Sequence, residues 1–382
     1  MSKISFISRV NPLNIEKYSG STYHINQALI ESGFEMNYIY GFPETHWRLL
    51  RWKRAFYKKI FNKRYLIDRS PTRINAAAHK IQENLKNKEA EVVFSESSLS
   101  ICKLKTNLPI VFYTDSTFAS MVGYYTEFSN LSRETIKNGM LFEKLALENC
   151  TKAIYTSEWA ANSAMKDFGI ASSKIEVVPR GANFQVQRDM KSFQQILANK
   201  KHDICHLLFV GKDWERKGGD FAVNVVKQLN EKGIPAKLTV VGCQPTINES
   251  SKSFVNIQGY LNKNKPDDLA KMIALYDRSH YFLLPTYAEC FGISFSEAAA
   301  FGLPSIAFDT GGVGSAVVNG KNGQLFDLKT HENAFSDFIT QNFTDTTAYN
   351  ALAISSFQEY LTRLNWDASG KRLAEIIGNV IQ

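Results

Sequence analysis

Short apolar runs alternate with amphipathic segments along most of the chain, and this alternation predicts its secondary structure. Runs such as 3–8, 91–95 and 109–114 are bounded by polar or glycine-bearing turns and have the length of buried strands. Segments between them, such as 133–149, carry apolar residues every three or four positions, which predicts helices. Because strands that alternate with helices form parallel sheets, the pattern predicts an α/β protein.

A second series of strands and helices begins after residue 202. Apolar runs at 205–210 and 237–241 predict its first strands, whereas the segment before it is polar and poor in β-branched residues, which predicts a linker. The chain of 382 residues is long enough for two domains with full cores. We expect a first domain at 1–184, a linker at 185–201, a second domain at 202–364 and a last helix at 365–382.

The composition indicates the class of protein and the compartment in which we expect it. Hydrophobic residues make up 44% and charged residues 21% of the chain, which is ordinary for a soluble globular protein. No apolar run approaches the roughly 18–20 residues of a membrane span, and the first residues lack the apolar core of a signal peptide. The five cysteines are scattered and form no CxxC pair, so we expect a cytoplasmic protein with reduced thiols and no zinc site. We assign His202 and His206, which lie four residues apart at the start of a predicted strand, a structural role.

The excess of positive charge is local. The net charge is +8, and eight basic residues with no acid among them lie between Trp47 and Tyr65. Apolar residues recur through this segment at three- and four-residue steps: Leu49, Trp52, Phe56 and Ile60. The segment 46–66 therefore predicts a basic amphipathic helix.

Two explanations of this basic segment stay open. Basic amphipathic helices with aromatic residues lie on anionic membrane surfaces, where each Lys or Arg adds about 1 kcal/mol of binding. The segment would then hold a peripheral protein on the inner face of the membrane, beside a lipid-linked acceptor. Alternatively, it is an insertion that packs its apolar stripe on its own domain. We expect no nucleic acid, because no recognised nucleic-acid module accompanies the charges.

The stretch 281–314 carries the first candidate chemistry. Its apolar start predicts a buried strand, a turn with Glu289 follows, and a helix containing Glu297 comes next. In open α/β sheets, ligands bind at the carboxyl ends of the strands. Amides at Phe291–Ile293 suit a phosphate, and the carboxylates on either side accept hydrogen bonds from hydroxyl groups. A phosphate flanked by hydroxyls describes a nucleotide sugar.

A cationic cluster follows the predicted strand 205–210. Gly211 permits a tight turn, and three cations, Lys212, Arg216 and Lys217, precede the glycines that open the next helix. Positive charge is disfavoured at a helix N-terminus, so the cluster indicates a bound anion.

Together these residues resemble a known family. Seven residues separate Glu289 from Glu297, Phe291-Gly292 lies between them, and Gly302-Leu303-Pro304 follows. This pattern resembles that of the retaining glycosyltransferases of family 4. The resemblance implies the GT-B architecture, in which two Rossmann-like domains with parallel sheets face each other. It also implies an N-terminal acceptor-side domain, a C-terminal nucleotide-sugar domain, and a last helix that crosses back to the first domain.

The resemblance assigns roles on the donor side. Lys217 binds the donor diphosphate together with either Lys212 or Arg216, and the choice between these two stays open. Glu289 holds hydroxyls of the transferred sugar, and Glu297 holds those of the ribose. The other predicted donor-site positions are Gly211, Gly259 and Tyr260 near the nucleotide, with Cys290, Phe291, Gly292 and Ile293 at the phosphate.

Two residues are predicted on the acceptor side. Gly20 stands where the family has a glycine loop lining the cleft. Asp115 follows the predicted strand 109–114, where much of the family has a His-Asp pair, and Thr114 replaces the histidine here. We therefore group Asp115 with Lys217 and Glu289 as catalytic candidates, although an aspartate after a strand is also a common helix cap.

The resemblance implies a glycosyltransferase that retains the anomeric configuration, and we expect it to be metal-independent. It would move a hexose-type sugar from a UDP- or GDP-linked donor to a glycan or lipid-linked acceptor, in cell-surface polysaccharide biosynthesis. We expect no cofactor beyond the nucleotide sugar, because the sequence lacks the Asp-x-Asp motif with which many transferases hold a metal. A nucleotide-sugar 2-epimerase and a non-catalytic nucleotide-binding protein on the same fold remain alternatives.

Overall fold

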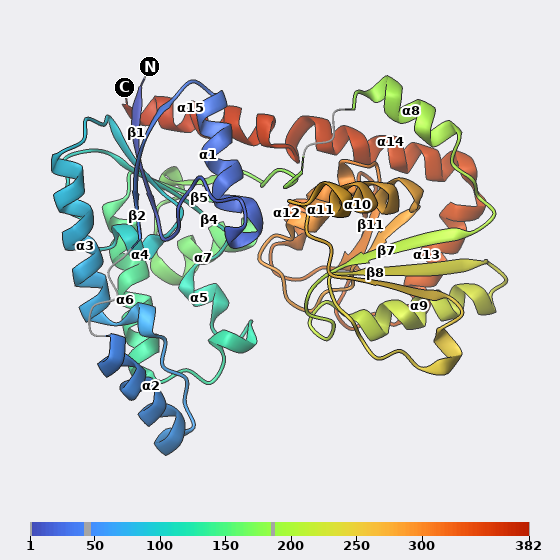
Figure 1. Ribbon diagram of the computed structural model, residues 1–382, viewed down its shortest axis with the longest axis horizontal. Helices are drawn as coiled ribbons and strands as arrows, with labels where there is room; N and C mark the ends of the chain where they lie inside the picture. The colour runs from blue at the N-terminus through green and yellow to red at the C-terminus, as the bar shows by residue number, and fades with distance from the viewer. Residues whose placement is uncertain (1, 42–46, 185–187, 382) are drawn as a thin grey trace. The chain divides into compact units, whose positions relative to one another are not determined.

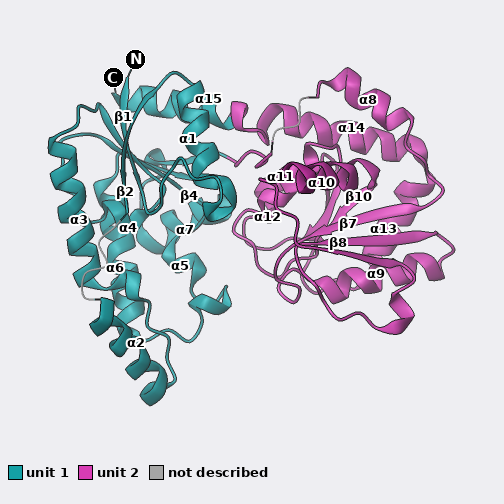
Figure 2. Ribbon diagram, viewed as in Figure 1, with its two compact units in different colours: residues 1–178, 369–382 teal, residues 179–368 magenta. Residues whose placement is uncertain are grey.

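The computed structural model of the protein describes residues 2–41, 47–184 and 188–381. The chain forms two compact units, unit 1 with residues 1–178 and 369–382 and unit 2 with residues 179–368 (Figures 1 and 2). Residue 46 of the predicted basic segment and residues 185–187 of the predicted linker lie outside the described residues. Within the described ranges, no helix combines the length and the apolar character needed to cross a membrane.

Unit 1 is built on a six-stranded parallel sheet in the order β2-β1-β3-β4-β5-β6. The strands are β1 (Lys3–Ser8), β2 (Glu35–Tyr40), β3 (Val92–Ser95), β4 (Ile110–Thr114), β5 (Lys152–Tyr155) and β6 (Ile175–Val177). The helices are α1 (Ser21–Glu31), α2 (Trp47–Phe61), α3 (Pro71–Lys86), α4 (Ser98–Ile101), α5 (Phe118–Met121), α6 (Arg133–Asn149), α7 (Glu158–Phe168) and α15 (Trp366–Ile381). Every residue of β3 is buried, as expected for a strand covered by helices on both faces.

Unit 2 repeats this plan with a parallel sheet in the order β12-β11-β10-β7-β8-β9. The strands are β7 (Cys205–Val210), β8 (Ala236–Val241), β9 (Val255–Gly259), β10 (Tyr281–Leu283), β11 (Ser305–Phe308) and β12 (Gly323–Phe326). The helices are α8 (Met190–Ala198), α9 (Gly219–Glu231), α10 (Pro266–Arg278), α11 (Ile293–Ala299), α12 (Val313–Ala316), α13 (Glu332–Thr344) and α14 (Thr346–Arg363). The α/β class predicted from the sequence is confirmed in both units.

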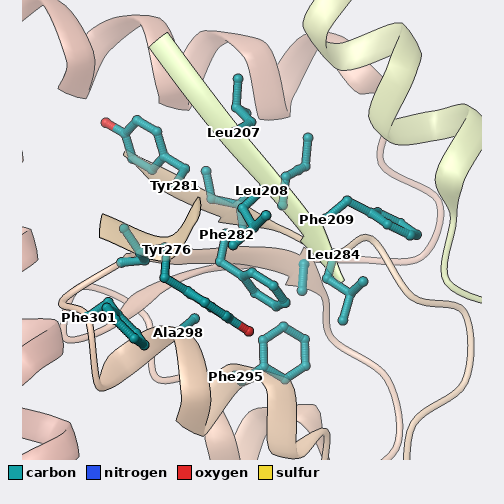
Figure 3. Packing of buried hydrophobic residues seen from close by; sticks show 14 of the residues in the cluster. Leu207, Leu208, Phe209, Tyr276, Tyr281, Phe282, Leu284, Phe295, Ala298 and Phe301 are labelled. Atoms are coloured by element: carbon teal, nitrogen blue, oxygen red, sulfur yellow. The ribbon is translucent and has the colours of Figure 1, made fainter. Parts of the chain in front are cut away.

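Aromatic side chains fix the helices of unit 2 on its sheet. The Phe282 ring of β10 meets the Phe295 ring of α11 edge-on, with centroids 5.7 Å apart (Figure 3). Tyr276 of α10 stacks on Phe301 at 4.7 Å. All four side chains are almost fully buried, so α10 and α11 have little freedom to move along the sheet. This packing holds the loop before α11 in a defined place.

The segment predicted as a linker contains a packed helix. Within α8, Phe193 stacks on Phe357 of α14 with centroids 4.5 Å apart, and Leu197 is buried in the core of unit 2. Asp189 caps the helix by accepting a hydrogen bond from the Ser192 amide at 2.8 Å. A scarcity of β-branched residues is shared by linkers and helices, and therefore could not separate the two.

Helix α2 docks on unit 1 through one face and exposes its apolar stripe. Tyr57 stacks on Tyr65 with centroids 5.3 Å apart, and Lys53 pairs with Glu134 of α6 at 2.6 Å. Leu50 is the one buried side chain of the helix. The stripe predicted from the sequence is instead in solvent, with exposed fractions of 67% for Leu49, 77% for Trp52, 54% for Phe56 and 59% for Ile60. The helix thus does not pack this stripe on its own unit.

Candidate active site

The sheet of unit 2 has a topological switch point between β7 and β10. The chain runs outward from β7 to β8 and β9 on one side, then returns to β10 and continues to β11 and β12 on the other. The connections after β7 and β10 therefore leave the sheet in opposite directions, and in sheets of this kind ligands bind in the crevice at the carboxyl ends of these strands. The loops after these strands carry Lys217 and Glu289, respectively.

One backbone hydrogen bond and one side-chain hydrogen bond join these two loops. The Tyr287 amide donates to the Arg216 carbonyl at 2.8 Å, and the Arg216 guanidinium donates to the Ala288 carbonyl at 2.6 Å. Gly218 lies between the loops with φ of 74°, and a Cβ atom there would overlap the Pro285 carbonyl. Only glycine combines this left-handed backbone with so close an approach.

A charged cluster lies where the loops meet. The Lys217 ammonium forms an ion pair with the Glu289 carboxylate, and an Arg216 guanidinium nitrogen lies 3.6 Å from the same carboxylate oxygen. Arg216 also pairs with Asp213 at 3.3 Å. The exposed fractions of the Lys217 and Glu289 side chains are only 11% and 14%, so each charge depends on its partners. The structure thus brings together two of the three predicted catalytic residues.

The residues around Glu289 contribute mainly backbone groups. Cys290 and Phe291 are buried, and Phe291 belongs to the hydrophobic core. Gly292 has φ of 86° and directly precedes α11, which begins at Ile293. The Gly312 amide donates to the Glu289 carbonyl at 2.9 Å and fixes the loop from the other side. Among residues 289–293, only Glu289 therefore carries a charged side chain.

Glu297 is held by a lysine that the sequence did not reveal. Its side chain is 3% exposed and pairs with Lys263, in the loop before α10. The Lys263 ammonium also lies 5.1 Å from the Phe184 ring centre. Burial, together with the nearby Glu297 carboxylate, raises the pKa of Tyr276 well above its usual range. Because no motif surrounds Lys263, only the fold could show that it neutralises Glu297.

Lys212 and Arg216, the alternatives for the second diphosphate ligand, lie in different surroundings. The Lys212 ammonium stands 5.0 Å from the ring centre of Tyr260, which follows β9. Gly211 directly follows β7 and its amide donates to the Val241 carbonyl at 2.9 Å, while Gly259 has φ of 70° and its carbonyl accepts a hydrogen bond from the Gly242 amide at 2.8 Å. Arg216, by contrast, shares the Glu289 carboxylate with Lys217. The loop contacts thus group Arg216 with Lys217 and Lys212 with Tyr260.

Gly20 and Asp115, the remaining predicted residues, belong to unit 1. Gly20 ends a turn in which Tyr18, Ser19 and Gly20 all have positive φ, and it immediately precedes α1. Asp115 directly follows β4 and is partly exposed. Both lie on the carboxyl edge of the sheet, because all its strands are parallel.

Sequence reasoning missed Glu96 at this edge. It follows β3, which adjoins β1 at the switch point of unit 1, and its carboxylate accepts a hydrogen bond of 2.7 Å from Ser8. An acid directly after a buried strand is the same signal that identified Asp115, and it could have identified Glu96. Among the residues that the structure describes, no group of three or more His, Cys, Asp or Glu side chains is arranged to hold a metal ion.

Comparison with known proteins gives the family. A family model described as "Glycosyltransferase Family 4" matches residues 21–186, and one described as "Glycosyl transferases group 1" matches residues 205–345. Together these matches cover every strand of the two sheets except β1. The chain belongs to glycosyltransferase family 4. The family predicted from the Glu289 and Glu297 motif is confirmed.

Individual relatives of this family 4 chain are distant. A D-inositol 3-phosphate glycosyltransferase of Corynebacterium diphtheriae is 21% identical over 290 residues, which cover 72% of this chain and 66% of that protein. The chain spans 66%, 51% and 38% of the length of three curated relatives that it matches.

Solved structures share the fold over nearly the whole chain. A sucrose-phosphate synthase of Thermosynechococcus elongatus matches with a TM-score of 0.67 and 16% identity, covering 100% of this chain and 99% of that one. HepE of Anabaena, solved in complex with UDP-glucose, matches with a TM-score of 0.62 and 15% identity over 99% and 100%. The GT-B fold class predicted for the chain is thereby confirmed.

Proposed function

We propose that the protein is a retaining glycosyltransferase that moves a hexose-type sugar from a nucleoside-diphosphate sugar to a glycan or lipid-linked acceptor. The observation that carries this proposal is the cluster of Lys217, Arg216 and Glu289 at the switch point of unit 2. It combines cations for a diphosphate with a carboxylate for hydroxyl groups within one crevice.

Lys217 and Arg216 would bind the donor diphosphate. At present both cations lie beside the Glu289 carboxylate. A diphosphate bound there would take over their hydrogen bonds, and Glu289 would then accept hydrogen bonds from hydroxyls of the transferred sugar. As the glycosidic bond breaks, negative charge grows on the leaving diphosphate, and the two cations stabilise it without having to move. We propose on this basis that transfer needs no metal ion.

Glu297 would bind the ribose of the donor. It lies in α11, eight residues after Glu289, and its charge is already balanced by Lys263. A carboxylate fixed in this way can accept two ribose hydroxyls without a further cation. The base is proposed to contact the turn at Gly259 and Tyr260. UDP is the first candidate nucleotide, because the structure of HepE is a complex with UDP-glucose.

The exposed stripe of α2 supports a membrane-bound acceptor. Leu49, Trp52, Phe56 and Ile60 form one apolar face, and Arg48 and Lys59 lie beside it. Such a helix rests on an anionic bilayer with its apolar face among the acyl chains. We propose that this face holds the protein on the inner surface of a membrane, where cell-surface polysaccharides are assembled on lipid carriers.

Nucleotide titration tests the donor site. We would titrate UDP, GDP and ADP into the full chain by calorimetry in the presence of EDTA, and repeat each titration with Lys217→Ala. We expect one nucleotide to bind, and its affinity to fall at least about tenfold in the variant, because a charge-assisted hydrogen bond is lost. If no nucleotide binds and no intact UDP- or GDP-sugar binds, the donor site is wrong.

Product analysis separates transfer from the other activities of the fold. Incubation of the matching nucleotide sugar with membrane extract should release nucleoside diphosphate and give a product with the donor's anomeric configuration. An epimerised donor without an acceptor product would instead identify an isomerase. Nucleotide binding with no conversion of any donor would identify a non-catalytic protein.

Vesicle binding tests the membrane face. The protein should bind vesicles of phosphatidylglycerol and phosphatidylcholine, and Trp52→Ser should weaken binding at least about tenfold, because a buried Trp side chain is worth more than about 1.5 kcal/mol. Leu141→Ser on α6 is the control, since Leu141 is also exposed in unit 1 but belongs to no stripe. Equal binding of both variants would rule out this face.

A further inference from the structure

We propose that the cavity between α2 and the rest of unit 1 is a binding site for a phosphate-bearing ligand. Given the proposed glycosyl transfer, this ligand is the acceptor, which would carry a phosphate or diphosphate group. The site is separate from the donor cluster of unit 2 and from the apolar stripe of α2.

The cavity has a volume of about 680 Å³. One wall is a single face of α2, because Trp47, Arg51, Arg54, Ala55 and Lys58 follow each other at helical spacing. The opposite wall is the segment 63–68, and the remaining lining comes from Arg9, Arg73 and Glu127. A cavity of this size accommodates a small organic ligand rather than a single ion.

Positive charge is concentrated in this cavity. Its lining contains seven basic side chains, Arg9, Arg51, Arg54, Lys58, Lys63, Arg64 and Arg73, but only two acidic ones, Asp68 and Glu127. Five of the eight basic residues that stand out in the sequence between 47 and 65 are among them. The local charge excess of the chain is therefore directed into one cavity and is not spread around a solvated helix.

Within the part of the chain that the structure describes, most of these cations have no acidic partner. Asp68 is already shared by Arg9 at 3.2 Å and Arg69 at 3.5 Å. Lys58 and Lys63 donate only to neutral asparagine side chains, at 3.0 and 2.6 Å. Among the described residues, the structure gives no ion pair to Arg51, Arg54 or Arg64.

Such an arrangement is unfavourable without an anion. Like charges that converge on one cavity repel each other and destabilise the folded unit. Guanidinium groups are the preferred ligands of phosphate, because each presents two parallel N–H donors to its oxygens. Several arginines around one cavity therefore fit a ligand with more than one negative charge, such as a diphosphate.

The location of the cavity connects this ligand to transfer. Arg9 directly follows β1, so the cavity reaches the carboxyl edge of the sheet of unit 1. Ligands of parallel α/β sheets bind at that edge, and Glu96 and Asp115 follow β3 and β4 there. A phosphate held by Arg51 and Arg54 would anchor an acceptor whose hydroxyl end extends toward these carboxylates.

Calorimetric titration of inorganic pyrophosphate tests the site. Wild type, Arg51→Gln/Arg54→Gln and Arg48→Gln/Lys59→Gln would be compared at one ionic strength. Both double variants remove two positive charges from α2, but Arg48 and Lys59 do not line the cavity. We expect the first variant to bind pyrophosphate at least about tenfold more weakly and the second to bind within about twofold of wild type, since only the first loses direct phosphate contacts.

A third variant examines the other wall. Arg64→Gln should also weaken pyrophosphate binding, and its fold should be intact because Arg64 is held by backbone hydrogen bonds of 2.9 and 2.8 Å to Asn130 and Ser132. Titrations in the Lys217→Ala background weaken the binding of an anion at the donor cluster, so that binding in the cavity can be measured above it. Dependence on Arg51 and Arg54 in that background supports the cavity even if the donor site fails its own test.

Farnesyl diphosphate distinguishes the two sources of a diphosphate. Tighter binding than pyrophosphate, with the same loss in Arg51→Gln/Arg54→Gln, would identify a lipid-linked ligand, whereas equal binding would identify a water-soluble one. Either result supports the site. Unchanged pyrophosphate binding in Arg51→Gln/Arg54→Gln would overturn the proposal, and so would an equal loss in Arg48→Gln/Lys59→Gln, which would reveal only a general effect of surface charge.

Discussion

Gly218 offers the sharpest test of how the donor crevice is built. It precedes α9 with φ of 74°, whereas Gly233 follows the same helix with φ of 81°. A Cβ atom at Gly218 would overlap the Pro285 carbonyl, but one at Gly233 would meet no atom within 4 Å. Alanine at both positions therefore has the same backbone strain, and only Gly218→Ala has the collision.

The free-energy cost of the backbone strain and that of the collision can be estimated separately. A left-handed conformation costs an alanine about 1–2 kcal/mol, partly offset by the lower entropy of its unfolded chain. Forcing an extra carbon into a packed contact adds about 1–3 kcal/mol. We expect Gly233→Ala to destabilise unit 2 by about 1 kcal/mol and Gly218→Ala by about 3 kcal/mol. For a unit of this size these values correspond to melting temperatures lowered by about 3 °C and about 9 °C.

Thermal unfolding and nucleotide titration together provide the assay. The added methyl group must push the Pro285 loop away from the Arg216 loop. The cations and Glu289 would then no longer lie at the positions that a nucleotide needs. Gly218→Ala should therefore also weaken nucleotide binding at least about tenfold. Gly233→Ala should bind nucleotide like wild type. Equal melting temperatures for the two variants would refute the close approach of the loops.

Three further predictions concern charged and titratable side chains of unit 2. Glu289→Gln should lower the turnover number by about 10²-fold or more, because it removes a charged group at the reacting sugar, while nucleotide affinity changes little; parallel kinetics and calorimetry would measure both. Lys263→Met should destabilise unit 2 by about 3 kcal/mol in urea unfolding, because the buried Glu297 loses its cation, and adding Glu297→Gln should recover most of this loss. Burial lowers the pKa of His280 from 6.5 to about 3, so below pH 6.5 the unfolded chain binds a proton that the folded chain does not. Stability should therefore fall by about 1.4 kcal/mol per pH unit between pH 6.5 and 3, and urea unfolding of His280→Gln should lack this component.

The sequence predicted the features that depend on local patterns. Strands buried on both faces appear as continuous apolar runs, so the sheet of each unit could be anticipated from segments such as 205–210. Glu289 and Lys217 were found because each follows such a strand. Their direct contact was not predictable, since it depends on β7 and β10 becoming neighbours in the sheet although they are far apart in the chain.

Other features depend on which face of a helix packs against the rest of the fold. The periodicity of α2 showed that it is amphipathic, but it could not show that Leu50 and Tyr57 dock while Trp52 stays in solvent. The periodicity also could not show that the Arg51 and Arg54 side chains of this helix line a cavity. In α8, the short polar sequence gave no reason to expect that Phe193 would reach the core. In each case, tertiary contacts that no local pattern encodes decide the outcome.

The discontinuous course of unit 1 constrains how the protein folds as it is synthesised. Strands β1 to β6 leave the ribosome first, but α15 follows only after all of unit 2 has been made. Gly370 of α15 packs against the Ala28 carbonyl of α1, and Leu373 and Ile377 are fully buried. Until α15 arrives, the nascent first unit must hold an uncovered apolar surface on α1, open to chaperones and to misassociation with other chains. Its native state therefore becomes available only after unit 2 has been translated.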